Sequence, residues 1–191
     1  MTSVRYRDIL RAPVVSSDAY LIGEVDGIRY NANDWISEFL LVATRRGLSH
    51  DLTGKSPLST SRALVPMDNI QAGRQAFLLY DSLAELEEGA LPENTNIPNL
   101  SNLLGKKIVT KGNQALGTLY DLEIEMGSNW EVLEMVVRLE KTMSEPLGIK
   151  KPLLSRLPDI VLDVDTIANI TEIVQLDLDL SDIRESMRIV E

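Results

Sequence analysis

Apolar residues recur at every second position over several short stretches of the chain, and this period of two predicts β-strands. The segment 132–139, VLEMVVRL, has apolar residues at 133, 135, 137 and 139, and successive side chains of a strand point to opposite faces. The segment 173–180, IVQLDLDL, alternates in the same way. Turn signals such as Asp26-Gly27 and the run 127–129 lie beside such stretches. The pattern predicts short strands joined by tight turns.

The same order of patterns occurs twice, which indicates a tandem duplication. The stretch APVVSSDAYLIGEV aligns with KKIVTKGNQALGTL, which places Gly23 on Gly117. The strand-like EFLLVAT then lies near VLEMVVR, and PMDNIQAGRQAFLLY aligns with DVDTIANITEIVQLD. The last alignment places Phe77 on Val174. Three matches in the same order are hard to attribute to chance, so we interpret the chain as two copies of one unit.

Each copy has several short strands and no alternation of strands with long helices, which predicts a small closed sheet because closure removes exposed strand edges. A short helix is expected after each copy. Ser82 and Glu85 fit a capping box, and Ser181 precedes three apolar residues at helical spacing: Ile183, Met187 and Val190. The predicted fold class is therefore mostly β, with two tandem small β-barrels, each followed by a short helix.

The stretch between the copies has the composition of a linker. Residues 81–103 include five acids and two prolines but no lysine or arginine, a composition typical of connecting segments. We therefore expect a first domain over residues 1–80, a linker with a short helix over 81–102, and a second domain over 103–191.

The residues that open and close the copies resemble the PRC-barrel family. Its members typically have an apolar pair, Gly-Lys, a Val/Ile pair, a turn and Gly-x-Val/Leu, then Pro-x-x-x-Ile before a last strand. The second copy matches the opening at 103–106 and Gly117, and the first matches the closing at Pro66 and Ile70. The first copy lacks the Gly-Lys pair, and the second lacks the closing proline. The resemblance covers nearly the whole chain except the linker, and its short apolar motifs specify a fold better than a function.

Composition narrows the classes of function. The 191 residues carry a formal net charge of −10 and basic residues cluster only in pairs, whereas a nucleic-acid binder normally gathers them in a patch. The chain has no cysteine and a single histidine, His50, which excludes a disulfide framework and a multi-histidine metal site. No apolar run approaches the roughly 20 residues of a membrane span. We expect a cytoplasmic protein that binds no nucleic acid and does not insert into the membrane.

Three stretches that suggest chemistry lack the residues that the chemistry needs. The run GLSHDLTGKS ends in 54–56, Gly-Lys-Ser, but Ser49 stands where a phosphate-binding loop has its first glycine, and a proline follows at once. His50 lies in the same polar loop and has no triad arrangement around it. Asp177 and Asp179 lack the glycine and the terminal glutamate of a calcium-binding loop. We therefore expect no enzymatic activity, no cofactor and no catalytic metal.

The resemblance implies a binding role. Tandem PRC-barrel proteins of this size are similar to the archaeal cell-division adaptors that act with the FtsZ ring and its membrane anchor SepF. The expected function is therefore a non-enzymatic protein–protein interaction adaptor in archaeal cell division, concentrated at the division site. Its expected partners are a SepF-type anchor and related PRC-barrel proteins. The alternative is an RNA-processing or ribosome-maturation factor of the RimM type, since RimM also carries a PRC barrel.

Five residues are candidates for a partner interface. Trp35 and Trp130 occupy nearly equivalent positions beside turns and serve either as packing residues or as binding hot spots. The other three are Ile183, Met187 and Val190, which follow the alternating strand near the C-terminus. This apolar surface either forms a twofold homodimer or packs between the two barrels.

Overall fold

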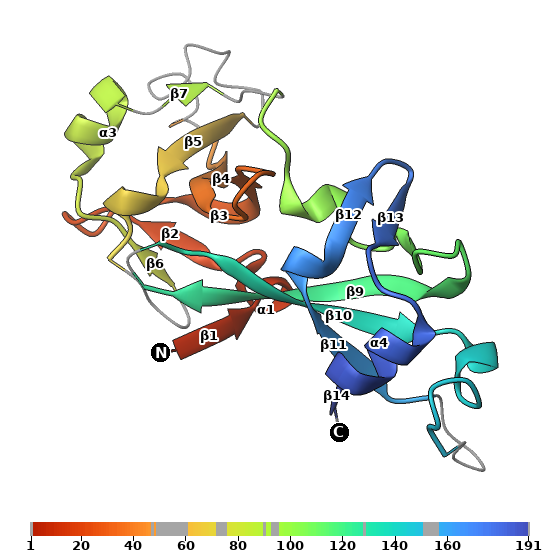
Figure 1. Ribbon diagram of the computed structural model, residues 1–191. Coiled ribbons are helices and arrows are strands. Elements are labelled where there is room, and N and C mark those ends of the chain that lie inside the picture. Colours follow the sequence, from red (N-terminus) through yellow and green to blue (C-terminus); the bar gives the residue numbers. More distant parts are fainter. Residues whose placement is uncertain are drawn as a thin grey trace. The chain divides into compact units, whose positions relative to one another are not determined.

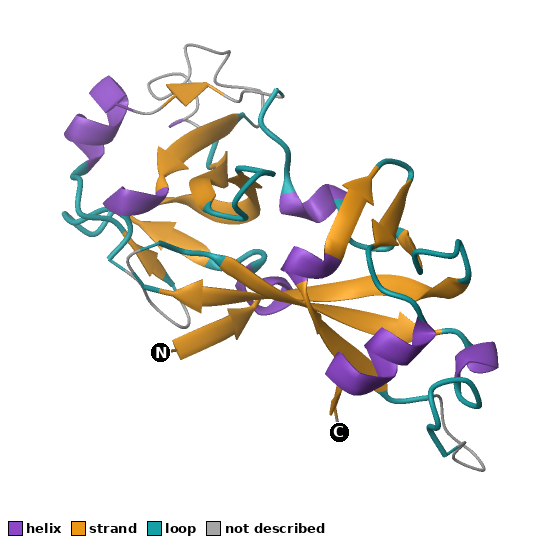
Figure 2. Cartoon of the chain, viewed as in Figure 1, coloured by secondary structure: helices purple, strands orange, loops and turns teal. Residues whose placement is uncertain are grey.

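The computed structural model describes residues 2–46, 48, 61–71, 76–89, 91–92, 96–127, 129–150 and 157–190. It divides into two compact units. Unit 1 comprises Met1–Ser101 together with Glu125–Glu131, and unit 2 comprises Asn102–Ile124 together with Val132–Glu191. Most of the described elements are strands (Figures 1 and 2), so the prediction of a mostly β chain is confirmed.

Unit 1 is a six-stranded sheet with short helices, in the strand order β6-β2-β3-β4-β5-β7. The strands of this sheet are β2 (Pro13–Val15), β3 (Leu21–Tyr30), β4 (Ser37–Thr44), β5 (Arg62–Pro66), β6 (Phe77–Leu78) and β7 (Leu91–Pro92). A further strand, β1 (Thr2–Arg5), does not belong to it and pairs with β9. Its helices are α1 (Tyr6–Ile9), α3 (Leu83–Gly89) and the 3-10 turn η1 (Met67–Asn69), and a further 3-10 turn, η2 (Leu100–Asn102), ends it.

The sheet of unit 2 has the strand order β12-β13-β8-β9-β10-β11-β14. These strands are β8 (Lys107–Val109), β9 (Ala115–Met126), β10 (Val132–Leu139), β11 (Asp159–Asp163), β12 (Ile167–Ile170), β13 (Ile173–Leu176) and β14 (Arg188–Val190). Its helix is α4 (Leu180–Ser186), and its 3-10 turns are η3 (Lys141–Met143) and η4 (Val164–Thr166). The last two residues of β9 and the turn that follows belong to unit 1.

The two sheets share their pairing directions as well as their strand order. In unit 1, β2 pairs antiparallel with β3 and parallel with β6, where Val14 lies opposite Phe77. In unit 2, β8 pairs antiparallel with β9 and parallel with β13, where Ile108 lies opposite Val174. The sequence alignment of Phe77 with Val174 therefore gives the same register in both sheets, as the duplication predicts.

Left-handed backbone positions also recur in pairs. Residues other than glycine rarely adopt a positive φ because the Cβ atom approaches the carbonyl oxygen. Three corresponding pairs adopt it here: Arg11 (66°) and Gly105 (81°), Ala19 (67°) and Asn113 (61°), and Trp35 (61°) and Trp130 (47°). The same turns thus recur in the same places in both copies.

Gly23 and Gly117, the anchor of the sequence alignment, occupy the same tight site. A Cβ atom on Gly23 would lie 2.1 Å from the Ala43 carbonyl oxygen, and one on Gly117 would lie 2.2 Å from that of Arg138. In each copy the neighbouring strand crosses where only glycine leaves room for it.

The central strand of each sheet is buried on both faces at its middle. Leu40, Leu41 and Val42 are consecutive buried residues of β4, and 135–137 are buried likewise in β10. The alternation predicted for 132–139 is therefore wrong at three positions, because Leu133 is exposed and Val132 and Val136 are buried. Register shifts in the pairing of β10 with β9 interrupt the period of two.

The end of the chain differs from its prediction. The strand expected over 173–180 stops at Leu176, and α4 starts after Asp179. Asp179, not Ser181, caps this helix, because its carboxylate accepts the backbone N–H of Ser181 at 2.9 Å and forms a capping box with Asp182. The helix ends at Ser186, and Val190 lies in β14, so its predicted helical position is wrong. The capping box of Ser82 and Glu85 is present.

The stretch expected as a linker packs within unit 1. Leu91–Pro92 pairs with Ala63 and Leu64 of β5, and the buried Asn99 fills the space above Gly27. The buried Arg29 donates from Nη1 to the carbonyl oxygen of Ile97 at 2.7 Å. Composition did not reveal this packing because it depends on contacts with residues far away in sequence.

Two further predictions concern closure and membrane insertion. The pairings among the described residues give each sheet an open path of strands, so they do not show closed barrels. Within the described ranges, no helix is both long and apolar enough to span a bilayer.

Candidate recognition surface

The structure buries three of the five predicted interface residues. Trp35 is 7% exposed and stacks on Tyr30, with ring centroids 5.3 Å apart. Trp130 is 4% exposed and packs against Phe77 at 5.9 Å, and Ile183 is fully buried. Such side chains offer no surface to a partner, so the two tryptophans are packing residues. Met187 and Val190 are half-buried.

The stretches considered for chemistry fall into two groups. Residues 54–56 and His50 lie outside the described residues. Asp177 pairs with Lys111 at 2.8 Å, and Asp179 caps α4. Within the described part of the chain, no group of three or more histidine and acidic side chains is arranged to hold a metal ion.

A row of exposed apolar side chains crosses one edge of the sheet of unit 1. Leu21 is 37% exposed, Leu78 is 42% exposed and Tyr80 is 60% exposed. Val15 lies opposite Leu21 on one side and opposite Leu78 on the other, so these side chains share a face of the sheet. We call Leu21, Leu78 and Tyr80 the apolar row.

Alternation along the edge segment explains why the row faces outward. Phe77 and Leu79 are buried in the core, whereas Leu78 and Tyr80 between and after them are exposed. The backbone is held in place, since Leu79 donates to Val15 O at 2.9 Å and Tyr80 donates to Asn69 O at 2.9 Å. The row is therefore presented by a hydrogen-bonded part of the sheet.

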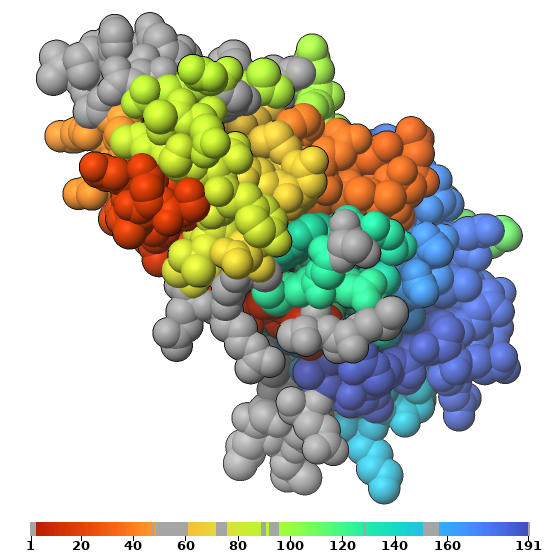
Figure 3. Space-filling model, turned by 90° about the vertical axis from the view of Figure 1, so that its left-hand side faces the viewer, coloured from red at the N-terminus to blue at the C-terminus, as the bar shows by residue number. Residues whose placement is uncertain are grey.

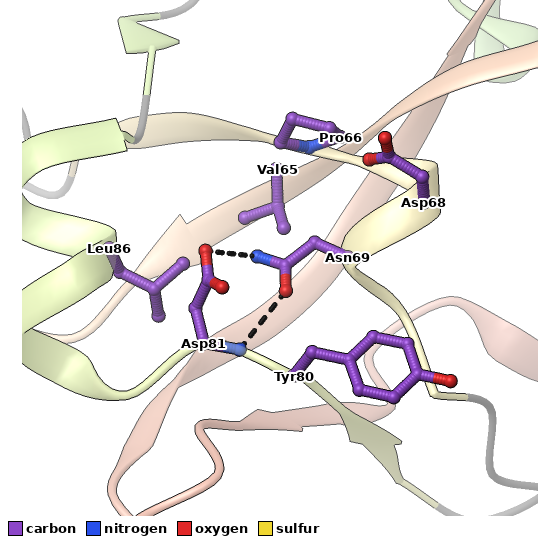
Figure 4. Close-up of a pocket in the computed structure, with 7 residues that line it drawn as sticks. All are labelled: Val65, Pro66, Asp68, Asn69, Tyr80, Asp81 and Leu86. Carbon is purple, nitrogen blue, oxygen red and sulfur yellow. Dashed lines mark hydrogen bonds between the residues drawn. The ribbon is translucent and has the colours of Figure 1, made fainter.

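A hollow of about 380 Å³ opens beside Tyr80 (Figure 4). Asn69 and Asp81 face each other in it, because Asn69 Nδ2 donates to Asp81 Oδ2 at 2.9 Å and the Asp81 backbone N–H donates back to Asn69 Oδ1 at 3.1 Å. Its lining combines apolar and acidic side chains: Val65, Pro66, Asp68, Asn69, Tyr80, Asp81 and Leu86.

A second hollow, of about 410 Å³, lies on the other side of Tyr80. Asp68 and Tyr80 line both hollows and so form the ridge between them. The remaining lining residues come from η1 and its surroundings and from the turn after β9: Met67, Ile70, Gln71, Met126, Gly127 and Trp130. In Figure 3 the yellow surface that includes η1 lies next to the yellow-green surface that includes α3.

Acidic side chains surround this surface. The segments 13–21, 66–71 and 76–89 together carry six acidic and no basic residues. A hydrogen bond from Ser16 lowers the pKa of Asp18, and hydrogen bonds from the Ser82 backbone N–H and hydroxyl lower the pKa of Glu85. Both carboxylates therefore keep their negative charge at neutral pH.

Unit 2 has a small residue and two polar residues at the positions of the apolar row. The correspondence is fixed by matching hydrogen bonds, since Ser17 donates to Asp81 O as Lys111 donates to Leu178 O. Ala115, Gln175 and Asp177 correspond to Leu21, Leu78 and Tyr80. The same strand arrangement thus forms without the exposed leucines and tyrosine.

Sequence reasoning did not identify the apolar row. Leu78 and Tyr80 belong to the apolar stretch AFLLY, which does not reveal by itself which side chains face the core. The available signal was the difference between the aligned copies, where Leu78 stands over Gln175 and Tyr80 over Asp177.

Comparisons with known proteins gave distant structural similarity alone. No family model and no curated protein matches the chain. Among solved structures, the chain is similar to a protein of Pseudomonas aeruginosa described as the 16S ribosomal RNA processing protein RimM. The identity is 18% and the TM-score 0.30, over 84% of this chain and 95% of that one. A similarity of this size leaves the function to be argued from the chain's own residues.

Proposed function

We propose that this chain is a non-enzymatic protein-binding module whose recognition surface is the apolar row of unit 1. One observation carries the proposal: the copies share a topology, yet only unit 1 has exposed leucine and tyrosine side chains at the positions of the row. The fold does not need them, because unit 2 forms the same pairings with Ala115, Gln175 and Asp177.

Exposing apolar surface to water is unfavourable. Single exposed leucines are ordinary, but a contiguous row beside hollows is typical of an interaction site. Protein interfaces combine an apolar or aromatic centre with a polar rim. Leu78 and Tyr80 supply such a centre, and Asp18, Asp68 and Asp81 lie around it. Tyrosine is also common among the residues that dominate binding energy.

The finer expectations remain part of the proposal. Closed barrels and a homodimer are supported by the sequence pattern, and a cytoplasmic location by the composition. The PRC type of the barrels, a place at the division site and a SepF-type partner in archaeal cell division are supported by the sequence resemblance. The similar solved structure is described as an RNA processing protein and not as a cell-division protein.

The second candidate is an RNA-processing role of the RimM type, which is the activity named for the similar solved structure. For this chain it rests on the PRC-barrel resemblance. The net charge of −10 and the acidic surroundings of the row disfavour a phosphate backbone, because phosphate contacts need lysine or arginine.

The test replaces the row by the residues of the other copy. The full chain and its Leu78→Gln/Tyr80→Asp variant capture proteins from lysate of the source cells, and each protein identified by mass spectrometry is then purified and titrated against both chains. We expect direct binding that the variant weakens by about tenfold or more. Leu133→Gln, which alters an exposed leucine of unit 2, should leave binding unchanged. Equal binding by both chains, or binding to ribosomal RNA in place of protein, would overturn the proposal.

A further inference from the structure

We infer that the partner presents a basic segment to unit 1, with a lysine or arginine side chain in the hollow beside Tyr80 and an apolar side chain on Leu78. This inference rests on the proposed function and adds the chemistry of the partner. Three features of the described residues support it: the charge around the row, the lining of the hollow, and the contrast with unit 2.

Carboxylates gather on this face of unit 1 without a pairing cation among the described residues. Asp68 and Asp81 form no ion pair within the described part of the chain, and Asp18 and Glu85 are exposed carboxylates at the start of α3. Like charges gathered on one face repel one another, and a complementary positive surface relieves this repulsion and speeds association. The face therefore favours a cationic partner.

The lining of the hollow suits a long basic side chain. Pro66 is half-buried and offers apolar surface for the methylene groups of lysine or arginine, while the buried Val65 and Leu86 line the hollow from the core. The carboxylates of Asp68 and Asp81 accept hydrogen bonds from the cationic head, and the ring of Tyr80 gives a face on which a cation packs. Only one oxygen of Asp81 accepts from Asn69, which leaves the other for a ligand.

Unit 2 has a lysine of its own beside the residue that corresponds to Tyr80. Asp177, which corresponds to Tyr80, forms its ion pair with Lys111 at 2.8 Å. The position that corresponds to Lys111 in unit 1 is Ser17. Asp177 of unit 2 is thus neutralised within the chain, whereas Asp68 and Asp81 of unit 1 have no ion pair among the described residues and are left for a cation from outside.

The experiment measures the binding of labelled peptides to the full chain by fluorescence anisotropy. The probe is a twelve-residue peptide of alternating arginine, leucine and serine, and its counterpart has glutamate in place of arginine. We expect the basic peptide to bind more tightly, and its affinity to fall as salt is raised. Asp68→Asn/Asp81→Asn should weaken binding by about tenfold, since both ion pairs lose a charge. Thermal melting checks that the double variant is folded. The single variant Asp68→Asn gives a second measurement of the loss of peptide affinity.

A matched variant separates a site from general attraction to an acidic protein. Asp165→Asn/Glu172→Gln removes the same charge from exposed positions of unit 2 and should change the affinity less than about twofold, as expected of screened surface charges. Equal weakening by both double variants would overturn the site. Preference for the acidic peptide, lost in Leu78→Gln/Tyr80→Asp, would overturn the basic partner and leave the protein-binding function standing. Single-stranded RNA that competes for this face would overturn both.

Discussion

At one edge of its sheet unit 1 carries Leu78 and Tyr80, and unit 2 carries Gln175 and Asp177 at the corresponding positions. The strands beneath them pair in the same register, with Val14 opposite Phe77 and Ile108 opposite Val174. The two surfaces have therefore diverged on a common backbone arrangement. The residues of the row are therefore not needed for folding, since the second copy forms the same strand pairings without them.

The paired tryptophans differ in another way. Trp35 and Trp130 occupy the same left-handed position before β4 and β10, yet both belong to unit 1. Trp35 stacks on Tyr30 of its own copy, whereas Trp130 comes from the second copy and packs on Phe77 of the first. The turn after β9 also bonds there, since Ser37 donates to Trp130 O at 3.1 Å. The units of packing therefore do not coincide with the units of duplication.

The largest expected effect comes from Trp130→Ala. Truncating a buried tryptophan lowers the free energy of unfolding by about 3–5 kcal/mol, and here the loss should fall on unit 1. Hydrogen exchange measured by mass spectrometry should show reduced protection in β4 and β6, with little change in β11. Trp35→Ala should affect the same unit.

A double-mutant cycle sharpens this test. Combining Trp130→Ala with Phe77→Ala should show a coupling of about 1 kcal/mol, because the rings are in contact. Loss of protection confined to unit 2, or strictly additive effects, would show that Trp130 supports its own copy.

A smaller effect, equal in both copies, is expected from Gly23→Ala and Gly117→Ala. Each new methyl group meets a backbone carbonyl oxygen, at 2.1 Å and 2.2 Å respectively, and the strands must separate to admit it. Overpacking of this kind costs about 2–3 kcal/mol. Urea unfolding followed by circular dichroism measures the loss. Gly127→Ala is the control, since nothing lies within 4 Å of its added Cβ atom, and it should change stability by less than about 0.5 kcal/mol. If only one of the two glycine substitutions left the stability unchanged, the close approach of the neighbouring strand would differ between the two copies.

The repeated topology could be predicted because it depends on residues that the alignment compares directly. Gly23 and Gly117 mark the close crossing, and the alignment of Phe77 with Val174 gives the register of the parallel edge strands. These features are local in sequence or repeated within it. Substituting these residues would disturb the packing of the backbone.

The features that the sequence did not predict depend on contacts between residues far apart in the chain. The pattern of apolar and polar residues carries no information about such contacts. The burial of Val136 follows from a register shift in β10, and the packing of the expected linker follows from Asn99 above Gly27. The burial of the candidate site residues depends on the same kind of contact. Trp35 and Trp130 looked suitable for an interface by residue type, and only the fold shows that they are buried while Tyr80 is exposed.

The smallest effect, and the only stabilising one, is expected where the copies differ in a backbone position. Arg11 and Gly105 both have positive φ, and both donate a backbone hydrogen bond of 2.8 Å to the following long strand, at Val25 O and Leu119 O. Arginine pays about 1–2 kcal/mol for this conformation, and glycine avoids that cost but gains freedom in the unfolded chain.

Arg11→Gly should therefore raise the free energy of unfolding of unit 1 by about 0.5–1 kcal/mol. The reciprocal change, Gly105→Arg, should lower that of unit 2 by a similar amount. Arg11→Ala separates the causes, because it removes the guanidinium group and keeps the strained backbone, so its stability should stay near that of the natural chain. Calorimetric melting measures all three. If Arg11→Ala stabilised the chain as much as Arg11→Gly, the origin would be the exposed charge of the arginine, and the left-handed turn would carry no difference between the copies.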